Sequence, residues 1–318
     1  MTLPILLIIL GFIFLIKGAN WMINGSTLLA KKYNISDLVI GLTIVAFGTS
    51  APELVVNIIA SSEAHSDIVL GNVIGSNNFN LFVILGIVGL IYPIAVQSTM
   101  VKNEIPISLL AAVIFLLLST NFYSGSNGIS RIDGLLLLSL FAGFLFYIYK
   151  QMTKEKVQSE VVVSSTSNKK IWLLICIGLL ALIIGGKLVV DNAVELATSL
   201  GVSQKMIGLT IIAAGTSLPE LVTSVVAAFK KNSDIAIGNI IGSNIFNILL
   251  VLAISSIIHP IDYNTNFNPS LYFLIGGTLF LLVAMFTGKK LKLDRWEAAI
   301  LLFAFVLFTV YVISKEIN

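Results

Sequence analysis

The chain contains one segment twice. Residues 41–94 begin GLTIVAFGTSAPELVV and residues 208–261 begin GLTIIAAGTSLPELVT, and the two segments align without a gap. Each copy places one glutamate, Glu53 or Glu220, inside a long apolar stretch. An internal duplication in an apolar chain is typical of transporters built from two structural repeats, in which the substrate site lies where the repeats meet near the middle of the membrane.

The composition indicates a membrane protein. Of the 318 residues, 57% are hydrophobic and only 11% are charged, whereas a soluble domain is about one quarter charged. Apolar runs of about 18–25 residues recur along the chain, and each is long enough to cross a bilayer as a helix. A soluble protein with this many buried helices would need far more charge to cover its surface. The lone Cys176 excludes an intrachain disulfide and argues against a zinc or redox centre.

We predict an all-α polytopic membrane protein with ten transmembrane helices. A polar, Ser/Lys-rich linker, 151–170, separates a first five-helix repeat, 1–150, from a second one, 171–318. An odd number of spans per repeat forces the second copy to insert upside down, so the repeats are inverted. The predicted spans are 3–24, 37–62, 68–92, 103–121, 130–150, 171–199, 204–229, 235–259, 268–287 and 295–314.

The lysines and arginines predict the orientation. Basic residues concentrate in the segments that face the cytoplasm. With both termini outside and the linker in the cytoplasm, only Arg131, Lys205 and Lys315 lie outside. The inside segments then hold Lys31, Lys32, Lys102, Lys150, Lys154, Lys156, Lys169, Lys170, Lys230, Lys231, Lys289, Lys290, Lys292 and Arg295. We therefore expect a multi-pass protein of the cell membrane with this orientation.

The repeated motif G-T-S-x-P-E predicts a helix that is broken in mid-span. Proline removes one backbone donor and clashes with the carbonyl four residues earlier, which here belongs to a glycine that itself loosens the helix. Irregular backbone cannot face lipid, so the break must face protein or a polar cavity. The freed carbonyls then lie beside the hydroxyls of Thr49, Ser50, Thr216 and Ser217, and the two glutamates add carboxylates.

A second repeated element, G-N-x-I-G-S-N-x-F-N, supplies neutral oxygens at residues 71–80 and 238–247. Ser76 and Asn80 are four residues apart, so they lie on one helical face. The polar residues of this element are Ser76, Asn77 and Asn80 in the first copy and Ser243, Asn244 and Asn247 in the second. Serine and asparagine also serve as interhelical contacts in membranes, so a purely structural role is the alternative for these six.

Carboxylate, hydroxyl, amide and carbonyl oxygens without Cys or His describe a site for Na⁺, Ca²⁺ or another hard cation. Two carboxylates neutralise one Ca²⁺ or two Na⁺, so such a site could exchange one for the other. A third Na⁺ would leave net positive charge and make the exchange electrogenic. Two symmetric buried glutamates, each after a helix break, favour function over a role as interhelical hydrogen-bonding groups.

At these motifs the chain resembles the calcium/cation antiporter superfamily, whose members include the sodium/calcium exchangers. The two segments look like the α-repeats of that superfamily, and the resemblance covers the whole two-by-five layout. It implies a ligand site formed by the second and third helices of each half, and it implies that the first and sixth helices slide as a pair across a rigid core.

The resemblance also implies ligands. Carried onto matching positions, the Ca²⁺ ligands are Glu53, Glu220, Thr49 and Thr216. The Na⁺ sites add Ala46 carbonyl and Ser76 in one half, and Ala213 carbonyl and Ser243 in the other. A central position lies among Glu53, Glu220, Asn80 and Asn247, with Ser50, Asn77, Ser217 and Asn244 around it.

One position bears on ion choice. The potassium-dependent branch and some prokaryotic exchangers carry Asp where this chain has Asn247, so the chain looks more like the potassium-independent sodium/calcium branch. The cation/proton branch carries Glu in a G-N-A-x-E motif where this chain has G-S-N, and it fits less well. We still expect protons to compete with cations at the two glutamates, because burial disfavours a charged carboxylate.

The leading hypothesis is Na⁺/Ca²⁺ antiport, with Na⁺ entry driving Ca²⁺ extrusion. The alternative within transport is exchange of Ca²⁺ or another divalent cation for H⁺. A cation channel is less compatible with one central two-carboxylate site. An intramembrane hydrolase lacks a nucleophile–base arrangement, so no enzymatic activity and no cofactor are expected. The linker is too short for a regulatory calcium-binding domain. The expected partners are the ions and the bilayer, with no nucleic acid and no obligatory protein partner, since a monomer suffices.

Overall fold

The computed structural model describes residues 2–120, 127–154, 167–200 and 213–317. The first half contains α1 (Thr2–Tyr33), α2 (Asp37–Ile40), α3 (Ala46–Thr49), α4 (Ala51–Ser62), α5 (Ser66–Asn78), α6 (Leu85–Ile91), α7 (Ile105–Ser119) and α8 (Arg131–Lys154). The second contains α9 (Asn168–Ser199), α11 (Ala213–Gly215), α12 (Leu218–Phe229), α13 (Ser233–Phe246), α14 (Leu252–Ile258), α15 (Asn268–Ala284) and α16 (Arg295–Ile317).

Short π-helical segments join several of these helices into continuous spans. They are η1 (Gly41–Val45), η2 (Phe79–Ile84), η3 (Met100–Glu104) and η5 (Asn247–Val251), and a 3₁₀ turn, η6 (Thr265–Phe267), precedes α15. Four two-residue strands complete the described elements: β1 (Ile94–Ala95), β2 (Gly128–Ile129), β3 (Ile261–Asp262) and β4 (Lys292–Leu293).

The helical multi-pass architecture predicted from the sequence is confirmed. Among the described residues, eight helical stretches are long and apolar enough to cross a membrane. A ninth span is a bent pair, Asp37–Thr49 followed by Ala51–Ser62, with 46° between the two parts. The predicted span 204–229 lies partly outside the described residues, and its described part is α11 and α12.

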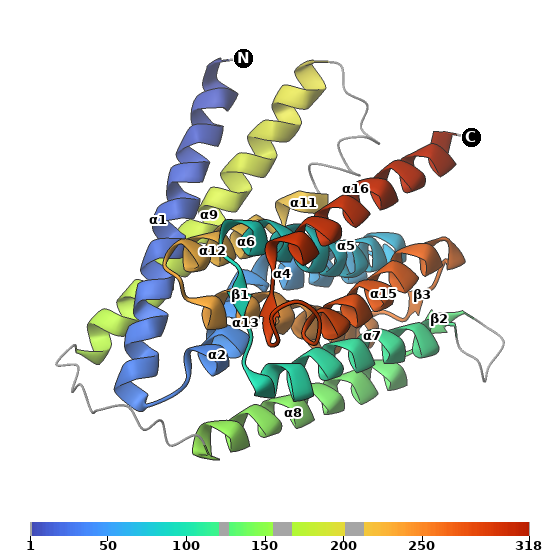
Figure 1. The fold of residues 1–318 in the computed structure, drawn as a ribbon. Coiled ribbons are helices and arrows are strands. Elements are labelled where there is room, and N and C mark those ends of the chain that lie inside the picture. Colours follow the sequence, from blue (N-terminus) through green and yellow to red (C-terminus); the bar gives the residue numbers. More distant parts are fainter. Residues whose placement is uncertain (1, 121–126, 155–166, 201–212, 318) are drawn as a thin grey trace.

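Helices α1 and α9 form a close pair at one side of the molecule (Figure 1). Glycines make the contact: a Cβ at Gly18 would lie 2.7 Å from the carbonyl oxygen of Gly178, and one at Gly11 would lie 2.9 Å from that of Gly185. Gly11 contacts Gly185, and Gly18, further along α1, contacts the earlier residue Gly178 of α9. The two helices therefore run antiparallel. Since they are the first helices of the two halves, this direction is the one that inverted repeats require.

The first helix is longer than predicted. Its apolar run weakens after residue 24, but α1 continues to Tyr33. Gly25 faces α9, where a Cβ would meet the side chain of Ile175 at 2.8 Å. The small residues that weaken the hydropathy signal are thus the ones that let the pair stay packed over this length.

The short strands join the two halves reciprocally. β1 pairs antiparallel with β4, and β2 pairs antiparallel with β3. Strands β1 and β3 occupy equivalent positions in the aligned repeats, and each of them pairs with a strand of the opposite half. Ala64 and Lys231, also equivalent in the alignment, share a left-handed backbone with φ of 59° and 58°. Both observations indicate an approximate two-fold relation between the halves.

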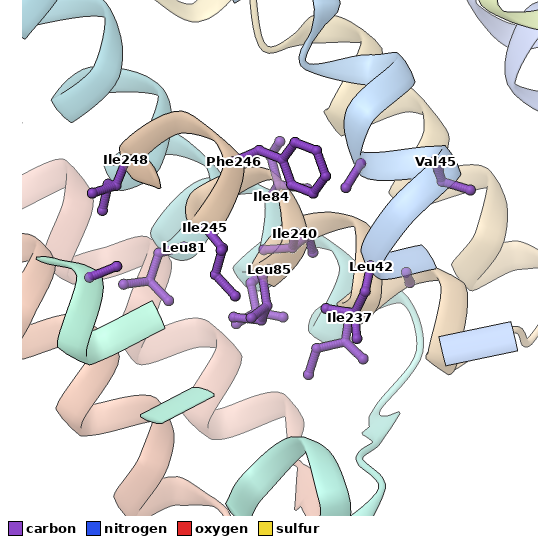
Figure 2. Packing of buried hydrophobic residues seen from close by; sticks show 14 of the residues in the cluster. Leu42, Val45, Leu81, Ile84, Leu85, Ile237, Ile240, Ile245, Phe246 and Ile248 are labelled. Carbon is purple, nitrogen blue, oxygen red and sulfur yellow. The ribbon is translucent and has the colours of Figure 1, made fainter. Parts of the chain in front are cut away.

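The centre of the molecule is an interlocked core of both halves. Segment η1 packs on α13, where a Cβ at Gly238 would lie 3.1 Å from the backbone nitrogen of Leu42. Figure 2 shows Leu42 of this segment next to Ile237 of α13, within a wholly apolar cluster. This cluster fixes the two repeated motifs against each other and therefore positions the polar groups that they carry.

Candidate cation site

Both repeated motifs break their helices at the predicted place. Ser50 separates α3 from α4 with φ −81° and ψ 5°, and Ser217 precedes α12 with φ −88° and ψ 8°. Each new helix has its proline in the first turn, where the missing N–H would have no helical partner. The break is therefore the same structure made twice, as the proline chemistry of the motif predicts.

The two glutamates lie in the first turns of α4 and α12, and both are buried, Glu53 with 1% of its surface exposed and Glu220 with none. A helix N-terminus favours a carboxylate because the free backbone N–H groups carry partial positive charge. The breaks thus place two negative groups where the backbone stabilises them, in the interior of an apolar protein.

Each carboxylate is held by the other half of the chain. The Ser217 hydroxyl donates to Oε1 of Glu53 at 3.2 Å, and the Ser50 hydroxyl donates to Oε1 of Glu220 at 3.1 Å. The two hydrogen bonds are related by the repeat symmetry. Ser50 and Ser217, predicted to surround the site, therefore orient one oxygen of each glutamate and leave the other free.

The threonines of the motif lie beside the same carboxylates. Thr49 is next to Glu220, and Thr216 is next to Glu53. The Thr49 hydroxyl is directed by Oδ1 of Asn239, which accepts its hydrogen at 3.0 Å. Its contact with the carbonyl oxygen of Ala46 is longer, 3.3 Å. With its hydrogen engaged by Asn239, the Thr49 oxygen keeps its lone pairs available for a cation.

Four asparagines of the second motif interlock between the halves. The Asn80 amide donates to Oδ1 of Asn244 at 3.1 Å, and the Asn247 amide donates to Oδ1 of Asn77 at 3.3 Å. These two bonds are again symmetric equivalents. Asn80 lies within η2 and Asn247 begins η5, and π-helical turns of this kind occur frequently at functional sites.

Several buried oxygens at this centre have no protein hydrogen-bond partner. An unsatisfied buried polar atom is costly, and a hard cation is a partner that carboxylate, amide and hydroxyl oxygens share. Within the described part of the chain, no group of three or more His, Cys, Asp or Glu side chains is placed to hold a metal ion. Two carboxylates with neutral oxygens therefore define the site, and its unpartnered oxygens are Glu53 Oε2, Glu220 Oε2, Asn80 Oδ1, Asn247 Oδ1 and Ser243 Oγ.

Three further predicted ligands, Ser76, Ala46 and Ala213, are described to different extents. Ser76 is buried and donates to Oδ1 of Asn72 at 3.1 Å, which leaves its lone pairs available. Ala46 is buried at the start of α3. Only the backbone of its equivalent, Ala213, is described, at the start of α11. The candidate residues lie on the predicted helices, and their roles as ligands stay predictions.

Sequence reasoning missed a set of buried residues around the carboxylates. The Asn239 amide donates to Oγ of Ser224 at 2.9 Å and to the carbonyl oxygen of Glu220 at 3.4 Å. In the first half, the Asn57 amide donates to the carbonyl oxygen of Glu53 at 2.7 Å. A signal was present, because Asn72 and Asn239 are the asparagines of the repeated G-N-x-I-G-S-N element.

Comparison with known proteins agrees with this geometry. A family model described as sodium/calcium exchanger protein matches residues 3–150 and 170–314. The sodium/calcium exchanger MaX1 of Methanosarcina acetivorans is 33% identical over an alignment that covers 97% of this chain and 98% of that protein. The inner membrane protein YrbG of Escherichia coli is 35% identical over 82% of this chain and 81% of its own length.

The fold also matches that of a sodium/calcium exchanger of known structure. A solved structure of the sodium-calcium exchanger NCX_Mj matches with a TM-score of 0.83 and 33% identity, covering 96% of this chain and 97% of that one. Matches of this extent include both repeats and the segments between them. The chain therefore belongs to the sodium/calcium exchanger protein family, and it is a multi-pass membrane protein.

Proposed function

We propose that this protein is a secondary active antiporter that exchanges Na⁺ for Ca²⁺ across the cell membrane. The observation that carries the proposal is the pair of buried glutamates, Glu53 and Glu220, each held through one oxygen by the opposite half. Their second oxygens have no protein partner. A pair of negative charges in an apolar interior requires positive charge, and the relatives named sodium/calcium exchanger support Na⁺ and Ca²⁺ as its source.

Charge balance supports exchange at one site. Two carboxylates are neutralised by one Ca²⁺ or by two Na⁺. The loaded site therefore has no net charge with either cation, and its burial in a low-dielectric interior has a similar electrostatic cost in both cases. The Ca²⁺ ligands in this proposal are Glu53, Glu220, Thr49 and Thr216. The Na⁺ ligands add Ala46, Ser76, Ala213 and Ser243.

Potassium independence is part of the proposal. Asn247 is neutral, and its amide nitrogen is engaged by Asn77, so the centre has no third carboxylate to balance an additional monovalent cation. We further propose that 1–150 and 171–318 act as two inverted repeats joined by a cytoplasmic linker, 151–170, with both termini outside. The protein works as a monomer, without enzymatic activity and without a resident cofactor.

The decisive experiment is flux in liposomes. Vesicles loaded with Na⁺ are diluted into Na⁺-free buffer that contains radioactive Ca²⁺, and uptake is expected only when internal Na⁺ is present. Parallel vesicles carry a pH gradient without Na⁺, and others contain K⁺ on either side. Uptake driven only by the pH gradient would replace Na⁺ with H⁺ as the coupling ion, and single-channel currents would replace antiport with a channel.

Replacement of Asn239 by leucine is expected to weaken Ca²⁺ binding about fivefold. Oδ1 of Asn239 accepts the hydrogen of Thr49, and without this acceptor the hydrogen is free to point at the cation. The loss of one buried hydrogen bond costs about 1 kcal/mol, and about 1.4 kcal/mol corresponds to a factor of ten in affinity. The measurement is the KM for Ca²⁺ in the same vesicles, with the maximal rate recorded separately.

Asn78 offers a matched control for this variant. It is also a buried asparagine, and its amide donates to the carbonyl oxygen of Ser270 in α15 and not to a residue of the repeated motifs. Asn78→Leu should leave the KM for Ca²⁺ unchanged even where it lowers the thermal stability. An equal rise in KM in both variants would show that Asn239 acts through stability and not through Thr49.

A further inference from the structure

A pocket of about 480 Å³ opens where α1, α9 and the end of α12 converge. Its polar lining comprises two lysines, Lys170 and Lys230, and three neutral groups, Asn24, Thr27 and Asn232. Its apolar lining comes from Ile23, Leu28 and Leu174. The pocket lies apart from the glutamates and is not used by the proposed exchange. Such a lining combines positive charge, hydrogen-bonding groups and aliphatic surface.

The two ammonium groups lack a counter-charge. Among the described residues, neither Lys170 nor Lys230 has an ion pair. The ammonium of Lys230 instead donates to Oδ1 of Asn24 at 2.8 Å and to the carbonyl oxygen of Asn20 at 3.4 Å. Partial burial lowers the pKa of Lys230, because desolvation penalises the charged form and no carboxylate offsets that penalty. An anion in the pocket would remove the imbalance.

The pocket is not a by-product of the repeated fold. In the aligned repeats, Lys230 corresponds to Glu63 and Asn232 corresponds to His65, and the same offset extended to α1 and α9 matches Asn24 with Asp191. The equivalent positions at the other end of the molecule thus include two acidic residues. The basic pocket is therefore specific to one face of the protein and requires an explanation other than the symmetry.

The residues around the pocket are of the kind found at a membrane surface. Lys170 is in the first turn of α9 and Lys230 directly follows the last residue of α12. Trp172, 47% exposed, is two residues from Lys170, and exposed tryptophans concentrate at the level of the lipid headgroups. The last turn of α1 brings Lys31 and Lys32 to the same end of the antiparallel pair.

We infer that this pocket binds the phosphate of an anionic phospholipid, held between Lys170 and Lys230. Anionic lipids are attracted to basic pockets between transmembrane helices. Asn24 and Thr27 can donate to the remaining phosphate oxygens, whereas the Asn232 amide already donates to Oδ2 of Asp37 at 2.9 Å. Ile23, Leu28 and Leu174 lie where the glycerol and the upper acyl chain would pass. A bound headgroup ties the start of α9 to the end of α12, and so ties the α1–α9 pair to the helix that carries Glu220.

The test is a titration of the purified full-length protein in neutral detergent. The probes are dioctanoyl phosphatidylglycerol, dioctanoyl phosphatidylcholine and inorganic phosphate, and the readouts are saturable binding and the thermal unfolding midpoint. Phosphatidylglycerol should bind saturably and raise the midpoint, whereas phosphatidylcholine should not. The double variant K170Q/K230Q should bind at least tenfold more weakly, and the single variants K170Q and K230Q serve if the double variant does not fold.

The matched control removes two other lysines. Lys289 and Lys290 are exposed between α15 and β4, outside the pocket, so K289Q/K290Q should bind phosphatidylglycerol as the unmodified protein does. Inorganic phosphate that binds as tightly as the lipid would retain the phosphate site and assign it to the free anion. Equal loss in both double variants, or the absence of saturable binding, would overturn the inference and reduce the lysines to general membrane-surface charge.

Discussion

Replacing either Glu53 or Glu220 with glutamine is expected to abolish Ca²⁺ exchange while the protein stays folded. Glutamine keeps the oxygen that accepts from Ser217 or Ser50, so the contacts between the halves survive. The lost charge leaves a divalent cation with half of its neutralisation in a buried site. Breaking a buried charge pair costs about 3–5 kcal/mol, which is at least about a 100-fold loss of affinity.

The measurement is Na⁺-driven uptake of radioactive Ca²⁺ in liposomes with each variant at equal protein density. Glu104 supplies the control, because it is a fully buried carboxyl that accepts a hydrogen bond from the Tyr147 hydroxyl in the first half of the chain. Glu104→Gln should retain exchange. If Glu53→Gln or Glu220→Gln exchanged Ca²⁺ at the normal rate, the central pair would not be the transport site.

The helix breaks and their glutamates could be predicted because the cause is local. A proline two residues after Ser50 or Ser217 removes a helical hydrogen bond and clashes with the glycine carbonyl four residues earlier, so it favours a break at this place independently of the packing, and the duplication shows the same event twice. The inverted arrangement could likewise be predicted from an odd number of apolar spans per repeat. Both depend on residues that are close in the sequence, so neither required knowledge of the packing.

The contacts across the centre could not be predicted, because they depend on how the halves dock. Nothing in the motif indicates that Ser50 donates to Glu220 and not to Glu53, or that Asn239 of the second half directs Thr49 of the first. The π-helical turns at Asn80 and Asn247 could not be predicted either, because the sequence analysis assumed the ordinary spacing of an α-helix. The Asn80 and Asn247 amides each donate to an asparagine of the opposite half. Which residues they reach depends on these turns and on the apolar packing around them, and not on local propensity.

Replacing Gly178 with leucine is expected to destabilise the protein strongly and to stop transport. A Cβ at this position would lie 2.6 Å from the backbone nitrogen of Met22 and 2.8 Å from the carbonyl oxygen of Gly18. Backbone cannot move aside as a flexible side chain can, so α1 and α9 must separate. Overpacking of a close contact costs about 1–3 kcal/mol, and more where the backbone is displaced.

The measurement is the thermal unfolding midpoint in detergent, followed by exchange in liposomes for any folded fraction. Gly143→Leu is the control, because Gly143 is exposed on α8 and a Cβ there has no described atom within 4 Å. An equal fall of the midpoint in both variants would contradict the argument, since it would reflect the larger side chain and not the contact between helices.

The effect on transport follows from what the α1–α9 pair touches. Met22 of α1 packs against Gly48 beside the first helix break, where a Cβ would meet its terminal methyl group at 2.9 Å. Val190 of α9 packs in the same way against Gly215 beside the second, at 2.4 Å. The family resemblance implies that the pair moves past both breaks as one unit, and such a movement would need the glycine contact to keep the two helices together. Loosening that contact should therefore reduce exchange even at temperatures where the variant remains folded.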